Sequence, residues 1–414
     1  MSLKKGQRYR RAYILARVHG ISKVPSVAMF LDPWSLLEKE AISLESTAKL
    51  RGNVHQSSCA AVLQEYHDVI EARRDRTAIY QGFDLDQGQI RVIKLDLLKE
   101  TNGATAYSYL DGQPLTGSFV VVDGDRPPPY WAISYVWGPT PTGPNVHTFR
   151  TAQGEISMTE SLTACLKTLR RKGVEAFIWV DALCINQSDN AEKGIQIRNL
   201  GSVYRKSERV IVWMGETGLQ DESSPGIDWL QSAHALTCKT TGWCDMSTSS
   251  GSGLNGWDAR WDDVASILRQ EWFVRTWIIQ ELVLGKNISI VYGQSEIGWD
   301  CFMVSLFMGG DAILKNATPA IALHLTREKH RRGHKFKFLE LLELFSYTHA
   351  SEPRDKLFAH LSMAYDVEES IFDPDYNSRE EKVLEKYARG LVENKRALEL
   401  LYWAGSGKST EFCS

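Results

Sequence analysis

The segment YWAISYVWG (residues 130–138) is almost entirely apolar and ends at a glycine. Three more short apolar runs follow it: FIWVDAL (177–183), RVIVWMG (209–215) and NISIVYG (287–293). Strands that are apolar along their whole length are typical of a parallel sheet with helices on both faces. The sequence therefore predicts an α/β fold in which these four strands lie parallel in one sheet.

Helices are expected between the strands because apolar residues there recur at helical spacing behind polar caps. Ser157 and Glu160 have the spacing of a capping box, and Asp189 and Glu192 repeat it. The second of these helices should run to about Ser207.

The flanks are less regular. Residues 1–80 show weak periodicity and are expected to form an N-terminal extension, followed by an α/β domain over 85–300. The stretch 216–256, with its small polar run STSSGSGLNG (247–256), is expected to be a mobile surface insertion. Residues 301–414 should be mainly helical.

Two further strands and two C-terminal helices are expected outside the four central strands. QIRVIKL (89–95) and SFVVVD (118–123) have strand character. In the C-terminal region FKFLELLELFSY (336–347) is amphipathic, and Ser378 and Glu381 should cap a later helix.

The composition excludes several classes of protein. The chain has 414 residues, 43% hydrophobic and 24% charged, with a net charge of −3, which gives no electrostatic reason to expect nucleic acid or an anionic membrane as a partner. No apolar run approaches the length of a membrane-spanning helix. The seven cysteines form no CxxC pair, which argues against a zinc site or a disulfide framework. Residues 1–31 are basic, as in a transit peptide, but a solvated basic terminus is commoner, and a cytoplasmic protein is expected.

The segment WFVRTWIIQELVLG (272–285) reads as one apolar helix that nevertheless carries Glu281. An ionised carboxylate in the interior is costly unless it is paired. At 3.6 residues per turn Trp277 and Glu281 share one stripe of this helix. Two interpretations follow: a site carboxylate, or a structural carboxylate paired with Arg275 or Arg354.

Polar side chains gather where the apolar strands end. Ser134, Trp137 and Gly138 close the first strand, and Asp181 and Asn186 follow the second. In open α/β sheets ligands bind beyond the carboxyl ends of the strands. Such residues also often do no more than cap the next helix.

Other motifs are better explained without a site. Cys184 has no nearby histidine partner and is expected to be a buried thiol. His330 and His334 have metal-ligand spacing but lie in a basic stretch without acidic or cysteine neighbours, so no metal site is expected. AGSGKST (404–410) lacks the first glycine of a Walker A loop. Arg354 and Asp355 are expected to stabilise the start of a helix electrostatically. The alternative is that they form a buried ion pair.

Several of these segments together resemble the fungal heterokaryon-incompatibility (HET) domain. Its three blocks are similar to YWAISYVWG (130–138), to FIWVDALCINQSD (177–189) with the helix leading into SVYRKSERVIVWMG (202–215), and to WFVRTWIIQELVLG (272–285). SEPRDKLFAHLSMAYDVEESIFDPDY (351–376) resembles the segment that follows the domain in many such proteins.

The resemblance covers roughly 85–400 and keeps order and spacing. Gln270 and Lys193 stand where the family often has arginine, and Ser207 where it often has alanine. The tryptophan-rich segment that the family would place beyond residue 403 is missing, so the chain is expected to be truncated or divergent there.

HET domains are in turn distantly similar to TIR domains, which implies a TIR-like, flavodoxin-like fold here. In plant TIR domains a helix of the form Trp-Cys-x-x-Glu-Leu carries the glutamate that cleaves NAD⁺, and WIIQEL (277–282) is similar except for Ile278. The resemblance implies that Glu281 is the catalytic carboxylate and Trp277 a wall of the nicotinamide-ribose pocket. The mouth of that pocket would be lined by Ser134, Trp137, Gly138, Asp181 and Asn186.

The implied function is a cell-death effector of heterokaryon incompatibility that hydrolyses NAD⁺ at the nicotinamide–ribose bond. NAD⁺ or a related nucleotide would be the substrate, with no further cofactor. Self-association and an unidentified activating protein would be the partners, and neither nucleic acid nor membrane is expected. The alternative is a non-catalytic signalling module that acts by self-association or partner recruitment in non-self recognition.

Overall fold

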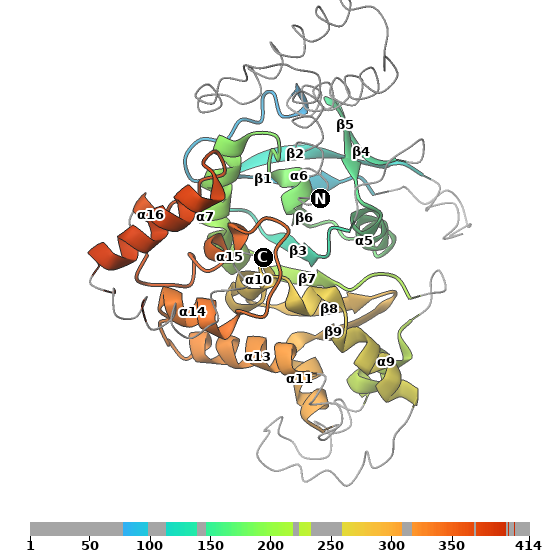
Figure 1. Ribbon diagram of the computed structural model, residues 1–414. Helices are drawn as coiled ribbons and strands as arrows, with labels where there is room; N and C mark the ends of the chain where they lie inside the picture. The colour runs from blue at the N-terminus through green and yellow to red at the C-terminus, as the bar shows by residue number, and fades with distance from the viewer. Residues whose placement is uncertain are drawn as a thin grey trace, which may run out of the picture. The chain divides into compact units, whose positions relative to one another are not determined.

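The computed structural model describes residues 78–97, 113–138, 146–217, 223–232, 259–308, 317–367, 370–394, 396 and 401. The described elements belong to one compact unit that runs from Ile79 to Ser414 (Figure 1). The expected N-terminal extension, the run 247–256 and the stretch 404–410 fall almost entirely outside the described residues. Among the described helices, none combines the length and the hydropathy needed to cross a lipid bilayer.

A nine-stranded sheet of the order β5-β4-β2-β1-β6-β3-β7-β8-β9 forms the centre of this described unit. The strands are β1 (Gln89–Leu95), β2 (Leu115–Asp123), β3 (Tyr130–Tyr135), β4 (His147–Thr151), β5 (Gly154–Met158), β6 (Phe177–Trp179), β7 (Arg209–Trp213), β8 (Ile288–Tyr292) and β9 (Ser295–Gly298).

The four predicted central strands are confirmed as neighbours in parallel pairing. β3 pairs in parallel with both β6 and β7, and β7 pairs in parallel with β8. The sheet as a whole is mixed, however, because β1 pairs antiparallel with both β2 and β6 and β9 pairs antiparallel with β8. The α/β class is therefore confirmed, with a parallel centre and antiparallel additions on both sides.

Helices cover both faces of the sheet, as predicted. They are α5 (Glu160–Arg171), α6 (Asp181–Cys184), α7 (Asn190–Lys206), α9 (Ala259–Leu268), η2 (Glu271–Val274), α10 (Ile278–Leu284), α11 (Trp299–Met308), α13 (Thr318–Arg331), α14 (Phe338–Leu344), α15 (Asp355–Phe358), η3 (Ser370–Phe372) and α16 (Glu380–Glu393).

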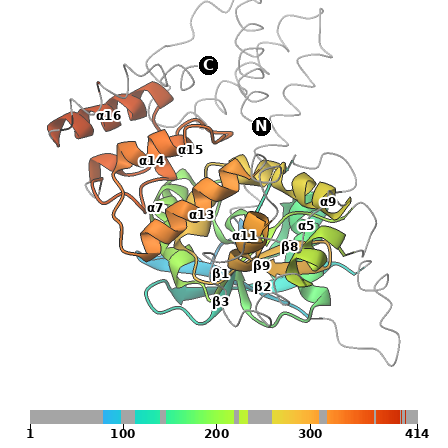
Figure 2. The same ribbon diagram turned by 90° about the horizontal axis from the view of Figure 1, so that it is seen from below.

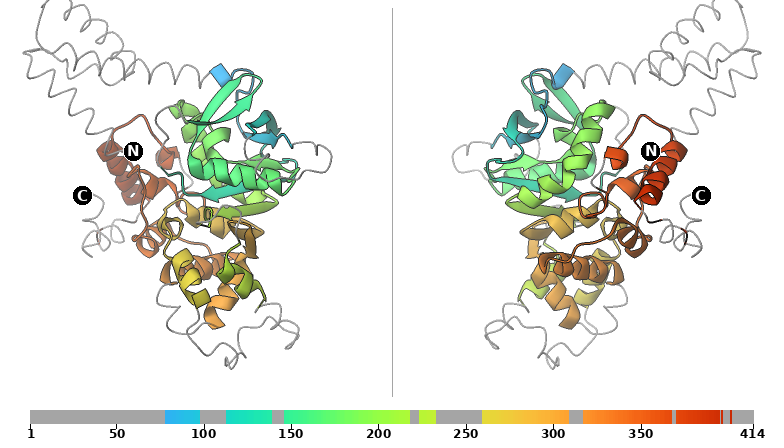
Figure 3. Two further views of the ribbon diagram at one scale, coloured as in Figure 1. Left: turned by 90° about the vertical axis from the view of Figure 1, so that its right-hand side faces the viewer. Right: turned by 90° about the vertical axis from the view of Figure 1, so that its left-hand side faces the viewer.

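Strand β3 shows how the two faces are divided, because successive side chains of a strand point to opposite sides. The Tyr130 hydroxyl donates to the carbonyl of Val203 in α7, whereas Trp131 lines a cavity together with Cys165 of α5. On the α7 side, α10 packs against α7 and against α13, and Figure 2 shows α13 with α11 next to it. The C-terminal helices, orange to red in Figure 3, thus extend the layer that contains α10.

Two predicted helix starts are corrected. Ser157 lies in β5, and Thr159 caps α5 by accepting from the amide of Leu162 at 3.4 Å. Helix α16 begins at Glu380 after Arg379, not after Ser378. The helix thus starts two residues later than predicted for α5 and one residue later for α16.

The α7 prediction is confirmed. Asp189 accepts from the amides of Ala191 and Glu192, and the helix ends at Lys206 with Ser207 as its C-cap. The Glu192 side chain does not complete the capping box. It pairs at 3.0 Å with the fully buried Arg91 of β1.

The segment 272–284 is not one helix, contrary to the prediction. It splits into η2 and α10 because the backbone between them pairs with His349: the Thr276 amide donates to the His349 carbonyl at 3.0 Å, and the His349 amide donates to the Val274 carbonyl at 2.6 Å. The predicted strand 177–183 also ends early, at Trp179, and Asp181 opens α6.

Part of the expected insertion 216–256 is built into the fold. Residues 225–232 are helical, and Ile227 and Leu230 are buried in the core. The Ser224 hydroxyl donates to Asp263 of α9 at 2.7 Å. This part of the insertion is therefore packed rather than a free surface loop.

Candidate functional site

Three buried side chains are hydrogen-bonded in series between β3 and α10. The Ser134 hydroxyl donates to the Glu281 carboxylate, and the Trp272 indole N–H donates to the Ser134 oxygen at 2.8 Å. Ser134 and Glu281 are 1% and 4% exposed. The strand alternation that places Tyr130 on the α7 side also places Ser134 there, so β3 presents a hydroxyl to the carboxylate.

Burial raises the pKa of Glu281 to about 7, and the negative charge of Asp181 adds to the increase. The Arg275 guanidinium and the Ser134 hydrogen bond act in the opposite direction. A carboxyl with such a pKa changes between its protonated and ionised forms near neutral pH. Environments of this kind are characteristic of sites that move or stabilise charge.

Asp181 is the second carboxylate of the site. It accepts from the indole N–H of Trp137 at 3.0 Å and from the amide of Ala182 at 2.7 Å. Burial raises its pKa, and Arg275 lowers it. Trp137 is 36% exposed, so it forms the outer edge of the site that contains Asp181 and Glu281.

Four of the predicted site residues are thus brought together: Ser134, Trp137, Asp181 and Glu281. Gly138 follows with φ of +69°, in the left-handed region that favours glycine, and a Cβ there would meet no atom within 4 Å. Gly138 therefore has a backbone conformation that other residues rarely adopt.

Asn186 and Trp277 have different contacts from those predicted. The Asn186 side chain accepts from the Ser188 amide at 3.1 Å, so it stabilises the turn before α7. The Trp277 indole N–H donates to Asp355 at 3.0 Å. The role of Trp277 as a wall of a nicotinamide-ribose pocket stays a prediction.

The structural alternative for Glu281 required an arginine partner. Among the described residues neither Arg275 nor Arg354 forms an ion pair with Glu281: Arg275 donates to the carbonyl of Tyr135, and Arg354 pairs with Glu352 at 2.8 Å. Arg275 acts on Glu281 only at longer range. Arg354 and Asp355 do stand at a helix start, that of α15, as predicted.

Three further residues of the site were missed by the sequence reasoning. Trp272 orders Ser134, the Tyr204 hydroxyl interacts with Glu281, and the buried Arg327 donates to the carbonyls of Leu282 and Lys286 at the end of α10. These contacts join residues far apart in the sequence, and no spacing pattern signals them.

The motifs set aside earlier show ordinary structural surroundings. Burial raises the pKa of the Cys184 thiol to about 12, which keeps it protonated near neutral pH. His334 lies 3.7 Å from Glu340 on the surface. Within the described residues, no group of three histidine, cysteine or acidic side chains is placed to hold a metal ion.

The fold and site define an α/β domain in which the carboxyl ends of parallel strands meet a helix with a buried glutamate. Residues 130–281 match the family described as heterokaryon incompatibility protein (HET), from the first residue of β3 to Glu281 itself. The segment from 130 to 281 is therefore similar to the HET domain.

A curated relative supports this assignment. The chain is 24% identical over 349 residues to heterokaryon incompatibility protein 6, OR allele, of Neurospora crassa. The alignment covers 68% of this chain and 51% of the relative, so the chain spans about half the length of that protein. No solved structure matches the chain.

Proposed function

We propose that this protein is an effector of heterokaryon incompatibility that hydrolyses NAD⁺ at the nicotinamide–ribose bond, with Glu281 as the catalytic carboxylate. The observation that carries the proposal is the arrangement of Glu281: a buried carboxylate with a pKa of about 7, oriented by Ser134 and placed near Asp181. The similarity of WIIQEL to the TIR helix adds to it, and NAD⁺ enters as substrate, not as a resident cofactor.

The chemistry fits one ionised carboxylate. Cleavage releases neutral nicotinamide and leaves an oxocarbenium-like ribosyl cation, which the negative charge of Glu281 stabilises. Water then adds to the cationic carbon and loses a proton, giving ADP-ribose, nicotinamide and H⁺. Asp181, which accepts from the Trp137 indole N–H, would accept from ribose hydroxyls as well.

A specific observation favours a second candidate function. Glu281 is 4% exposed, and Trp277 is engaged by Asp355. A non-catalytic module that signals by self-association, or by recruiting a partner protein, would use the same network only to hold α10. In either function the protein would act in the cytoplasm.

The deciding experiment measures nicotinamide release from NAD⁺ by the purified full chain over a range of protein concentrations. The wild type should release nicotinamide, and Glu281→Gln should lower the rate by about 10²–10³-fold, the usual effect of losing one electrostatic stabiliser. Glu385→Gln, an exposed glutamate of α16, is the matched control and should leave the rate unchanged. Absence of nicotinamide at every concentration, with a folded wild type, would decide for the signalling module.

A further inference from the structure

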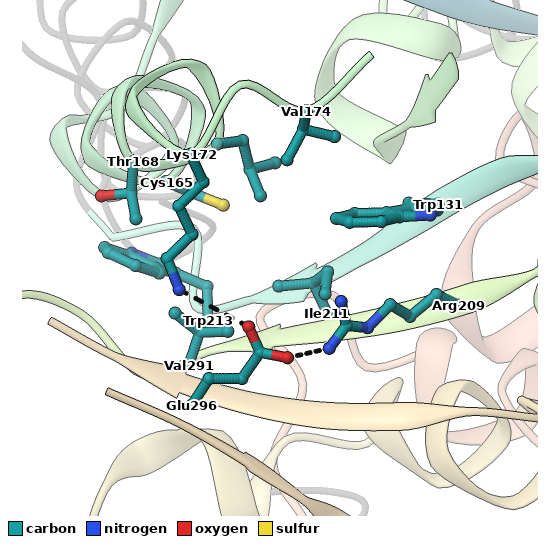
Figure 4. Close-up of a pocket in the computed structure, with 11 residues that line it drawn as sticks. Trp131, Cys165, Thr168, Lys172, Val174, Arg209, Ile211, Trp213, Val291 and Glu296 are labelled. Atoms are coloured by element: carbon teal, nitrogen blue, oxygen red, sulfur yellow. Dashed lines mark hydrogen bonds and ion pairs between the residues drawn. The ribbon is translucent and has the colours of Figure 1, made fainter. Parts of the chain in front are cut away.

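A cavity of about 130 Å³ lies on the opposite face of the sheet from Glu281. It is enclosed by α5 and the strands β3, β7, β8 and β9 (Figure 4). Its apolar walls include Trp131, Ile211 and Val291. An apolar space of about 150 Å³ holds one benzene ring in a protein interior, so this cavity has the size of a single small ring.

The charged side chains that line the cavity are two cations and one carboxylate. Arg209 and Lys172 approach Glu296 from different sides in Figure 4. Arg209 forms an ion pair with Glu296, and Lys172 lies 3.5 Å from it. Within the lining, one carboxylate therefore faces two positive charges. Glu208, outside the lining, also acts on Arg209.

Both cations are in unfavourable surroundings. Burial lowers the pKa of Lys172, and the neighbouring Arg209 lowers it further. Burial also lowers the pKa of Arg209. A second anion beside them would relieve the repulsion between the two cations.

The aromatic residues add a donor and a flat surface. The indole N–H of Trp213 is buried and has no hydrogen-bond partner among the described residues, and Trp213 lines the cavity. The Arg209 guanidinium lies over the Trp131 ring at 4.9 Å. A buried donor without a partner is uncommon in native proteins and calls for an acceptor.

We propose that this cavity binds a small carboxylate with one planar apolar ring. The ring lies between Trp131 and the aliphatic wall, and the carboxylate oxygens accept from Lys172 and Arg209 beside Glu296. A planar carboxylate suits this site because it matches the flat guanidinium and carries one negative charge. The inference is independent of NAD⁺ hydrolysis, which the other face of the sheet would perform.

Benzoate is the probe, and isothermal titration calorimetry of the purified chain is the measurement. A dissociation constant of about 1 mM or lower is expected for a ligand of this size. Benzamide has the same shape without the charge and should bind at least about tenfold more weakly.

Three variants and one control locate the binding. Lys172→Met should weaken benzoate binding by about tenfold or more, whereas Lys167→Met on the same helix, which is outside the cavity lining, should leave it unchanged. Glu296→Gln should strengthen it, because the competing carboxylate is removed. Val174→Phe should abolish it by filling the space.

Several results would overturn the proposal: no benzoate heat at tens of millimolar, equal binding of benzamide, or equal effects of Lys172→Met and Lys167→Met. If Val174→Phe fails to fold, the opposite effects expected for Lys172→Met and Glu296→Gln still decide. Weaker binding in Glu296→Gln would show that benzoate does not compete with Glu296 for the two cations, and would overturn the proposal.

Discussion

The indole N–H of Trp277 donates a 3.0 Å hydrogen bond to the carboxylate of Asp355, 78 positions further along the chain. The same carboxylate accepts from the Tyr376 hydroxyl at 2.7 Å. Trp277 directly precedes α10, the helix that carries Glu281. The C-terminal region therefore holds the start of the site helix in place.

Removing this acceptor should destabilise the protein. Asp355→Ala leaves the N–H of Trp277 and the O–H of Tyr376 without their acceptor, and we expect a loss of about 2–4 kcal/mol in the free energy of unfolding. Asp355→Asn keeps one acceptor oxygen and should lose less. Urea denaturation measures both. The exposed Glu385, paired with Arg389 on α16, is the control, and Glu385→Ala should cost no more than about 0.5 kcal/mol.

The opposite end of α10 is held by a buried arginine. Arg327, 2% exposed, donates to the carbonyls of Leu282 at 2.6 Å and Lys286 at 2.7 Å. Arg327→Met keeps the aliphatic volume but leaves these carbonyls unpaired, so we expect a loss of about 2–4 kcal/mol in urea denaturation. Arg331, half exposed on the same helix, provides the matched variant, and Arg331→Met should change stability by less than about 1 kcal/mol. Equal effects of the two variants would show that Arg327 does not cap α10.

The centre of the fold could be predicted because burial is visible in the sequence. β3, β7 and β8 are each mostly apolar, as expected for strands that are covered on both faces. Ser134, near the end of β3, and Asp181, which follows β6, could then be placed at the same edge of the sheet. Glu281 was added to this site by the resemblance of WIIQEL to the TIR helix.

The rest depends on contacts that the sequence does not encode locally. Nothing near Ser134 indicates that Trp272, 138 positions away, orders its hydroxyl. The break between η2 and α10 is made by hydrogen bonds to the backbone of His349. The apolar pattern of 272–285 gives no sign of this contact, because His349 is far away in the sequence. The direction of β1 was likewise open, since its strand character is the same in parallel and antiparallel pairing.

Glu281 should also make stability depend on pH. Its folded pKa of about 7 lies above the ordinary value of 4.5, so the folded state binds the proton more tightly than the unfolded state. This contribution is fully present below about pH 4.5 and is lost as the pH rises to about 7, a change of about 3 kcal/mol. Glu281→Gln has no charge to desolvate and should not show this loss.

The measurement is the free energy of unfolding of wild type and Glu281→Gln near pH 5 and near pH 8. The variant should gain on the wild type between the two pH values, because only the wild type ionises a buried group. A variant that is less stable than the wild type by the same amount at both pH values would show that Glu281 contributes through its hydrogen bonds alone.

The pH dependence of NAD⁺ cleavage gives the sharpest test of how the site residues act on one another. If ionised Glu281 is the active form, the rate should rise with pH and level off above a midpoint near its pKa of about 7. The Ser134 hydrogen bond lowers that pKa and the charge of Asp181 raises it. Ser134→Ala should therefore move the midpoint to higher pH, and Asp181→Asn should move it to lower pH.

These two shifts in opposite directions separate titration of Glu281 from a general loss of structure. Both variants are expected to lower the maximum rate as well, since both residues face the site. A general loss of stability would not move the pH midpoint up in one variant and down in the other. Asp262→Asn, an exposed carboxylate at the start of α9, should leave the midpoint where it is. If Ser134→Ala and Asp181→Asn move the midpoint in the same direction, the titrating group is not Glu281, and its charge cannot be what stabilises the ribosyl cation.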